Sequence, residues 1–291
     1  MSKRRAFTII ELLVVTIIIA ILAAIMLPVF ASVRGEAKKS VCISNHRQAQ
    51  VAMMLYLSDY DDRFPPPDYD MNITNSRIDR TWVQLVFPYL KSFRVFNDPA
   101  DYGPRPAAEA TFDEDLVPGD TASQYYQASM RSNIGYNYLY LATPIKTPSN
   151  TWEVQSKSLS EIGDHTLLYV DTVYGRDAAG SPVGGGSYLV IPPCRLAGTL
   201  QGKVDTFTGL VVPNDPVTVY AAHAGWDETP NSPFEFGLAW PFHNTKMTIM
   251  RVDGHASTAT TFNLSDGCNV DTGWSGLIRD ASRYLWSPTG Y

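Results

Sequence analysis

A histidine and an aspartate near the C-terminus could support acid–base or metal chemistry if they met in space. His243 is followed by nine residues and then by Asp253-Gly254. Lys246–Val252 has the composition of a strand, and seven strand residues span about 23 Å. His243 and Asp253 would then lie at opposite ends of the strand, so we predict no shared site. Asp253-Gly254 is a strong hairpin signal, and the pattern predicts a β-meander with its first turn at Asn244-Thr245.

Three aspartates close to the end of a predicted helix could bind a hard cation. Asp59, Asp61 and Asp62 stand in "SDYDDRF", and Ca²⁺ prefers clustered carboxylate oxygens. The EF-hand pattern, with its glycine and distal glutamate, is absent. We expect a solvated helix end and keep these residues as weak Ca²⁺ candidates, with no other metal or cofactor expected.

The cysteines do not form a zinc-ribbon pattern. Cys42, Cys194 and Cys268 include no CxxC pair. Cys194 and Cys268 could form a disulfide if the body of the protein is exported. Unpaired buried thiols are the alternative.

The net charge and the absence of enzyme motifs argue against a nucleic-acid-binding protein and favour no enzyme class. The net charge is -6, and an acidic body argues against a nucleic-acid partner. The sequence lacks GxSxG, HExxH, GxxxxGK[ST] and a strand-linked GxGxxG, which are the signatures of common enzyme sites. We therefore expect no enzyme.

The strongest signal is an apolar N-terminal segment that contains one acid. From Phe7 to Val33 the only formal charge is Glu11, and the basic stretch Lys3–Arg5 precedes the segment. A hydrocarbon core of ~30 Å needs roughly 20 helical residues, so the segment is long enough to span it. The basic leader favours a cytoplasmic N-terminus and an exported body. A carboxylate in hydrocarbon is costly, which indicates a function and a partner for Glu11.

Three interpretations of this segment compete. A secretory signal peptide has a shorter apolar region, of about 7–15 residues. A plain membrane anchor explains the length but leaves Glu11 without a reason. The third interpretation comes from a resemblance, because "RRAFTIIELLVV" is similar to the class III signal of type IV pilins and type II secretion pseudopilins.

The resemblance implies a specific maturation. Prepilin peptidase would cut between Ala6 and Phe7 and the new amine of Phe7 would be methylated, although the family usually has Gly in place of Ala6. Glu11 would become the fifth residue of the mature chain, and its carboxylate would meet the Phe7 amine of a neighbouring subunit in a filament. Pro28 would become the twenty-second residue, where many pilins also have proline, and its missing N–H predicts a kink.

A second resemblance covers more of the chain. His243 to Gly254 resembles the processing-associated H-x(9)-DG signature of a large group of bacterial pilin-like proteins. The stretches "VCISNHRQAQVAMMLYLSDYDDRFP", "SLSEI" and "GYN" agree with the same group. Relatives often have Cys-Pro where Asn97-Asp98 stand here, so Cys42 has no disulfide partner in that loop.

The predicted fold is α+β and pilin-like, with a long N-terminal helix packed on a globular body rich in antiparallel β-sheet. We expect a leader at residues 1–6, a membrane-spanning or filament-core half at 7–33, an amphipathic half at 34–62, and an exported body at 63–291. The helix would be ~80 Å long. Its amphipathic half would bury Val33, Ala37, Val41, Ala49, Ala52, Met53, Tyr56, Leu57 and Tyr60.

Within the body, the pattern predicts a short helix and six strands. The helix is expected at Thr81–Lys91, and the strands at Asn133–Leu141, Thr166–Asp171, Ser187–Ile191, Val217–Ala222, Lys246–Val252 and His255–Phe262. The tyrosines of the first strand could stack on carbohydrate, but cross-strand packing is their commoner use.

Together, these observations predict a structural subunit of a type IV pilus or a type II secretion pseudopilus. Its partners would be prepilin peptidase, other pilin-like subunits, the inner-membrane assembly platform and the lipid bilayer. It would begin as a single-pass inner-membrane protein and end in a periplasmic or cell-surface filament. The alternatives are a minor or tip subunit that binds a glycan or protein, and an exported enzyme anchored by the helix.

Overall fold

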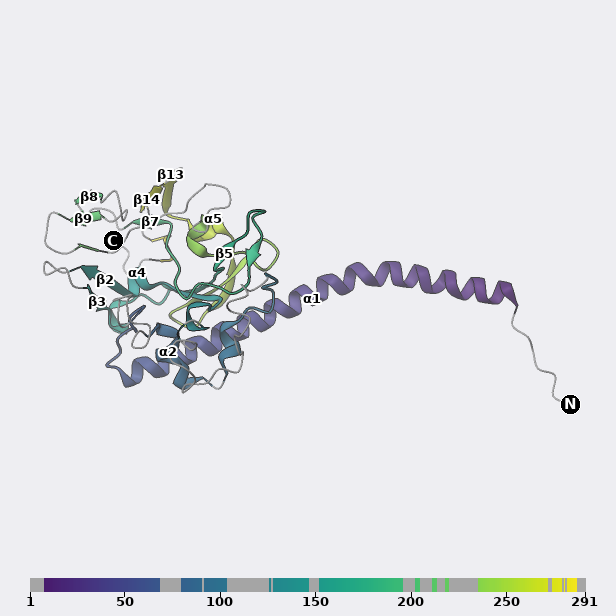
Figure 1. The fold of residues 1–291 in the computed structure, drawn as a ribbon, viewed down its shortest axis with the longest axis horizontal. Coiled ribbons are helices and arrows are strands. Elements are labelled where there is room, and N and C mark those ends of the chain that lie inside the picture. The colour runs from purple at the N-terminus through teal and green to yellow at the C-terminus, as the bar shows by residue number, and fades with distance from the viewer. Residues whose placement is uncertain are drawn as a thin grey trace.

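A single long helix and a β-rich body make up the chain in the computed structural model (Figure 1). The structure describes residues 8–68, 80–90, 92–103, 126, 128–146, 152–195, 202–204, 211–213, 218–219, 235–271, 274–278, 280 and 282–286. The predicted strand core at Val217–Ala222 is described only at Thr218–Val219, and its other residues lie outside the described ranges.

The helices and strands follow one another along the chain with these bounds. The helices are α1 (Ile9–Asp59), α2 (Trp82–Val86), η1 (Phe87–Tyr89), η2 (Phe93–Phe96), α4 (Tyr138–Leu141), η4 (Leu159–Glu161), η5 (Glu235–Leu238) and α5 (Thr261–Leu264). The strands are β1 (Ile134–Tyr136), β2 (Ala142–Lys146), β3 (Trp152–Ser156), β4 (Leu167–Asp171), β5 (Gly175–Arg176), β6 (Pro182–Val183), β7 (Cys194–Arg195), β8 (Gly202–Val204), β9 (Val211–Pro213), β10 (Thr218–Val219), β11 (Met247–Arg251), β12 (Ala256–Ala259), β13 (Cys268–Asp271) and β14 (Trp274–Ile278).

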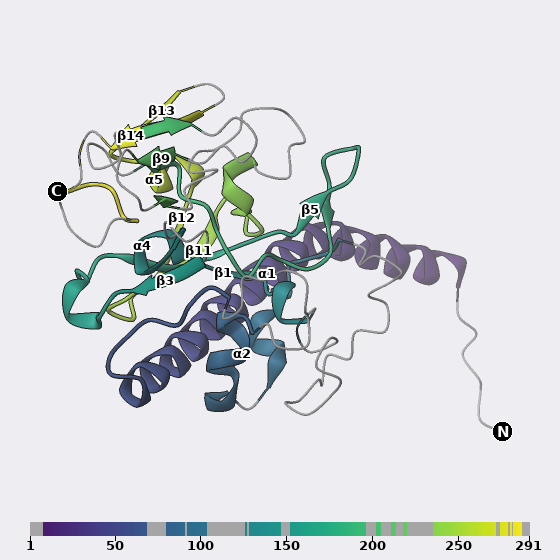
Figure 2. The same cartoon turned by 60° about the vertical axis from the view of Figure 1, so that its left-hand side comes forward.

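The helix α1 confirms the predicted long N-terminal helix. Its 51 residues correspond to a rod of roughly 76 Å at 1.5 Å per residue. It runs unbroken through Pro28 and curves gently along its N-terminal half, which projects from the body (Figure 1). Figure 2 shows α2 and β11 beside the C-terminal half, and both contact it.

The buried face of α1 differs in part from the predicted one. It consists of Cys42, His46, Ala49, Ala52, Met53, Tyr56 and Leu57. Val33, Ala37, Val41 and Tyr60, which were expected on this face, are exposed. The apolar pattern omitted His46, which is fully buried because its ring nitrogen hydrogen-bonds a buried carboxylate of the body.

A four-stranded antiparallel sheet forms the centre of the body, in the order β1-β4-β11-β12. All five residues of β4 are buried, because α1 covers one side of this region and other parts of the body enclose the rest. Smaller sheets have the orders β10-β2-β3, β13-β14-β7, β5-β6 and β8-β9, and the β14–β7 pair is parallel. The architecture is therefore the predicted pilin-like α+β arrangement.

The helix α2 packs against α1 and contacts the sheet through aromatic side chains. Trp82, fully buried, stacks on Tyr169 of β4 with ring centroids 5.0 Å apart. Its indole N–H donates to the carbonyl of Tyr188. The predicted helix at Thr81–Lys91 is thus confirmed as α2 followed by η1.

Three strand predictions need correction. The segment Asn133–Leu141 forms a strand only at β1, because the buried Asn137 side chain donates to the carbonyls of Leu167 and Trp286 and the backbone turns there into α4. Tyr136, Tyr138 and Tyr140 are buried, so they pack within the body instead of offering a carbohydrate surface.

The other two corrections concern strand length. Ser187–Ile191 pairs with Tyr136 through a single bridge at Leu189 and is otherwise irregular. His255–Phe262 forms β12 and then turns into α5, because Thr260 and Asn263 make a capping box that starts a helix.

Candidate functional site

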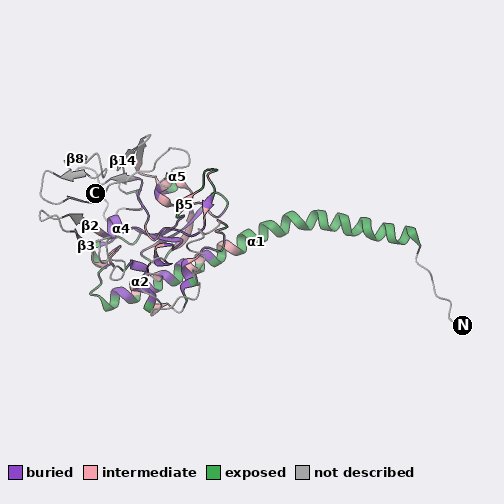
Figure 3. Ribbon diagram, in the orientation of Figure 1, coloured by how far each residue is buried: buried purple, intermediate pink, exposed green. Residues whose placement is uncertain are grey.

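The N-terminal half of α1 leaves its apolar side chains uncovered. Every residue from Thr8 to Ala37 is exposed, as Figure 3 shows along the projecting part of the helix. Phe30, for example, is 71% exposed. This helix is long and apolar enough to cross a membrane. Such a large apolar surface requires lipid or other helices as its environment.

Glu11 caps the start of this helix. Thr8 is the N-cap, and its hydroxyl accepts a hydrogen bond from the backbone N–H of Glu11. One carboxylate oxygen of Glu11 accepts from both the N–H and the hydroxyl of Thr8, each at 2.8 Å. The carboxylate is therefore held at the helix end nearest the predicted cleavage point. Ala6 and Phe7 lie outside the described residues.

A turn bounds β11 at each end of the H-x(9)-DG segment. Asn244 and Thr245 have positive φ angles, and the backbones of His243 and Lys246 bond each other across this turn. At the other end, Gly254 has φ +86°, and Asp253 accepts the backbone N–H of His255 at 2.8 Å. The β-meander prediction is confirmed, with His243 and Asp253 at opposite ends of the strand.

Each end of the segment reaches α1 by a different contact. Gln50 of α1 donates to the carbonyl of Val252, beside the Asp253-Gly254 turn. At the opposite end, the buried His243 joins a cluster that contains Cys42 of α1. The motif therefore positions the central sheet on the helix.

A buried polar cluster connects α1 to the sheet around Asp171. Its carboxylate accepts hydrogen bonds from the Cys42 thiol at 3.2 Å, from His46 Nε2 at 2.8 Å and from the backbone N–H of Thr248. His243 Nε2 lies 3.7 Å from the other oxygen of Asp171 and 3.0 Å from Asp98 Oδ2. The cluster thus contains two carboxylates, two imidazoles and a thiol.

The environment shifts the proton affinities of two members of the cluster. Burial, followed by the negative charges of Asp171 and Asp98, raises the pKa of the Cys42 thiol well above its ordinary value. Burial works against charge on His243 as well, but contact with Asp98 and the charges of Asp98 and Asp171 outweigh it and raise the pKa of the imidazole. The carboxylates therefore favour a neutral thiol and a charged His243.

Sequence reasoning missed this cluster because its members come from separate segments. Cys42 and His46 are four residues apart, which places them on one helix face, and this spacing is the one local signal. Asp171 ends a buried strand, and Asp98 follows η2. Only the tertiary fold brings these residues to His243.

The other candidate residues stay apart from this cluster. Asp59, Asp61 and Asp62 are exposed, and Asp59 accepts the hydroxyl of Tyr89 at 2.6 Å. Within the described part of the chain, the one His, Cys, Asp and Glu group with converging ligand atoms is the cluster around Asp171. The ligand atoms of the three aspartates do not converge in this way, and their weak Ca²⁺ assignment stays a prediction.

The cysteine prediction is tested only in part. Cys42 is a free, buried thiol, and Cys268 is disulfide-bonded. Cys194 has its backbone in β7, in the same sheet as Cys268. Its side chain lies outside the described residues, so the pairing of Cys194 with Cys268 stays a prediction.

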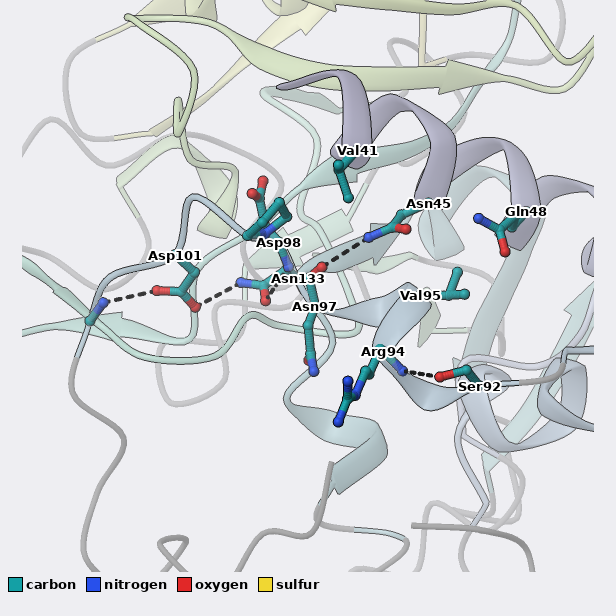
Figure 4. Close-up of a pocket in the computed structure, with 12 residues that line it drawn as sticks. Val41, Asn45, Gln48, Ser92, Arg94, Val95, Asn97, Asp98, Asp101 and Asn133 are labelled. Atoms are coloured by element: carbon teal, nitrogen blue, oxygen red, sulfur yellow. Dashed lines mark hydrogen bonds between the residues drawn. The ribbon is translucent and has the colours of Figure 1, made fainter. Parts of the chain in front are cut away.

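A cavity of about 570 Å³ lies beside the cluster, between α1 and the segment around η2 (Figure 4). Most of the residues that line it have polar side chains, among them Asn45, Gln48, Arg94, Asp98 and Asp101, and their apolar atoms line it as well. Asn45 donates to the carbonyl of Asn97, and Asn133 donates to Asp101, across the structure that surrounds the cavity.

A long apolar helix packed by its second half on an antiparallel sheet defines a pilin-like protein. The family model described as "Prokaryotic N-terminal methylation motif" matches residues 1–27. The chain thus carries a class III prepilin signal, which marks a processed pilin-like or pseudopilin-like subunit. Neither a curated protein nor a solved structure matches the chain.

The motif also indicates where in the cell the protein is located. Together with the apolar helix it indicates an exported protein anchored in the inner membrane. By family inference, the motif implies processing by prepilin peptidase and assembly into a filament.

Replacing Asp171 with alanine should loosen the body from α1. The change leaves His46 and the N–H of Thr248 without their buried acceptor, and each buried donor left unsatisfied costs about 1–3 kcal/mol. Urea unfolding of the full chain in detergent micelles measures the loss. The matched control Asp253→Ala removes an exposed turn hydrogen bond, worth about 0.5–1.5 kcal/mol. Equal losses for the two variants would contradict the structural role of Asp171.

Proposed function

We propose that this chain is a structural subunit of a type IV pilus or of a type II secretion pseudopilus. The single observation that carries the proposal is the uncovered apolar half of α1 behind a prepilin signal. In the membrane, this half is solvated by lipid with the leader in the cytoplasm. In the filament, neighbouring α1 helices replace the lipid as its packing partners.

The proposed assembly step pairs the amine that cleavage creates with the Glu11 carboxylate. Cutting between Ala6 and Phe7 releases an α-amine, and the Glu11 carboxylate lies one helical turn from Thr8 at the same end of the helix. A carboxylate and an amine that meet in low dielectric offset each other's desolvation. Pairing between subunits would therefore set how far an incoming helix slides along its neighbour.

The body then extends into the periplasm or to the cell surface on the filament exterior. The inner-membrane assembly platform would lift the processed subunit out of the bilayer. The proposal assigns no reaction to the body, since the sequence has none of the enzyme signatures considered above. The proposal extends to the H-x(9)-DG group, because both ends of this segment contact α1, through Val252 and through His243.

A minor or tip subunit that binds a glycan or a protein is the second candidate function. The polar cavity between α1 and η2 favours it, because amide, carboxylate and guanidinium groups suit a polar ligand. The abundance of the chain in purified filaments separates this role from that of a major subunit.

Processing can be tested on the mature N-terminus. Intact-mass and peptide mass spectrometry of protein from the native membrane should find a chain that begins with N-methylated Phe7. Protein from cells without prepilin peptidase should keep residues 1–6. A mature chain that begins upstream of Phe7 contradicts the cleavage proposal.

Replacing Glu11 with glutamine or valine should block filament incorporation while leaving the membrane form intact. Loss of a buried ion pair of about 3–5 kcal/mol predicts more than a tenfold drop, because 1.4 kcal/mol is a factor of ten. The ratio of filament to membrane protein, read by immunoblot of sheared filaments, measures it.

Glu36→Gln is the matched control for Glu11→Gln. Glu36 lies on the same helix and pairs with Lys39 at the exposed surface, where such a pair contributes little. The control should assemble normally. Normal incorporation of Glu11→Val would refute the role of Glu11 in assembly.

A further inference from the structure

Four metal-ligating side chains converge where α1 meets the central sheet. They are Cys42 from α1, Asp98 after η2, Asp171 at the end of β4, and His243 before β11. All four are buried, and each offers a ligand atom within 4.8 Å of the other three. Exposed acidic groups gather for many reasons, but a buried set of this kind excludes most of the water that would otherwise solvate it.

Two of these ligand atoms have only each other as a close partner. Among the described residues, Asp98 Oδ2 and His243 Nε2 lie 3.0 Å apart as an ion pair but make no hydrogen bond of suitable geometry. The side chains are 1% and 3% exposed. Burial makes a poorly aligned polar contact costly, and an ion between these atoms would satisfy both at once.

We propose a structural zinc site at this junction, formed by Cys42, Asp98, Asp171 and His243. The donor set favours zinc because calcium and magnesium prefer oxygen ligands alone, whereas zinc accepts thiolate, imidazole and carboxylate together. Four protein ligands and no open position are the mark of a structural site, not a catalytic one. This proposal does not depend on filament assembly.

The distances suit tetrahedral coordination after small side-chain rotations. Zinc bonds of about 2.0–2.3 Å place neighbouring ligand atoms about 3.3–3.8 Å apart. Cys42 Sγ already lies 3.2 Å from Asp171 Oδ1, and His243 Nε2 lies 3.7 Å from Asp171 Oδ2. His46 hydrogen-bonds Asp171 from outside the ligand set, as supporting groups around metal sites commonly do.

Proton release accompanies binding of the ion. The Cys42 thiol gives its proton to solvent as the sulfur–zinc bond forms, since a coordinating thiol is deprotonated. His243 binds through Nε2, so an imidazolium at this position gives its Nε2 proton to solvent as well. The two carboxylates and the thiolate then carry three negative charges against the two positive charges of the ion.

The cavity beside η2 adjoins the proposed site, because Asp98 forms part of both the cavity wall and the ligand set (Figure 4).

Metal analysis of the full chain tests the proposal. The protein is purified in detergent micelles, stripped with EDTA, dialysed against zinc chloride and then against metal-free buffer. Elemental analysis should find one zinc ion per chain, and the thermal midpoint should rise with zinc. Cobalt chloride in place of zinc should give a thiolate-to-cobalt charge-transfer band.

Matched variants assign the site. His243→Gln and Cys42→Ser should lower zinc affinity by more than about 100-fold, and Cys42→Ser should abolish the cobalt–thiolate band. His46→Gln should cost about 10- to 100-fold, as changes to supporting residues do. His255→Gln, at an exposed position two residues from Asp253, is the control and should bind zinc like the unchanged chain.

Two results would overturn the proposal, and neither depends on how the variants fold. One is an unchanged chain that retains no zinc and shows no cobalt–thiolate band. The cluster would then be a metal-free network of the ion pairs His46–Asp171 and His243–Asp98. The other is zinc that remains bound in Cys42→Ser and His243→Gln with unaltered affinity, which would place the metal elsewhere.

Discussion

The α1 helix has to satisfy two environments along one continuous rod. Its first half exposes an unbroken run of apolar side chains, and its second half is partly covered by the body from Cys42 onwards. Because the helix runs through Pro28 without a break, the position taken by the apolar half in lipid or in a filament also places the body. A membrane-to-filament transfer can therefore move the whole subunit as one piece.

The body is held on this rod by long-range polar contacts as well as by apolar packing. Asp171 hydrogen-bonds both Cys42 and His46 on one helix face. Sliding α1 along the sheet by one turn would therefore leave this buried carboxylate without those two partners. Burying charged groups is weak evidence for added stability, but such groups can select one arrangement over others. We infer that this cluster fixes the register of α1 on the sheet, while apolar packing of Ala49, Ala52 and Met53 also joins α1 to the core.

Much of the architecture follows from local sequence patterns. The length of α1, its end before the prolines after Arg63, the short helix α2 and the β11–β12 hairpin were all predictable from periodicity and turn residues. Those signals depend only on residues that are close in sequence, so they can be read from a single sequence. The assembly residues were accessible only because the N-terminal segment resembles a known signal.

The errors arise where distant residues decide the local conformation. Asn137 ends β1 because its side chain bonds carbonyls near residues 167 and 286, and no local pattern carries that information. The buried cluster was missed for the same reason, since Asp98, Asp171 and His243 meet Cys42 only in the folded chain. His243 was predicted as part of a turn, which is correct for its backbone, while the role of its side chain depends on tertiary structure.

The central claim is that α1 assembles into a filament core through its apolar half. Electron cryomicroscopy of filaments sheared from the producing cells tests this most directly. The account predicts a helical reconstruction in which this chain supplies subunits, residues 9–33 lie in the shared core, and the Glu11 carboxylate contacts the Phe7 amine of a neighbour. Filaments that lack this chain, or a core in which Glu11 faces no amine, would contradict it.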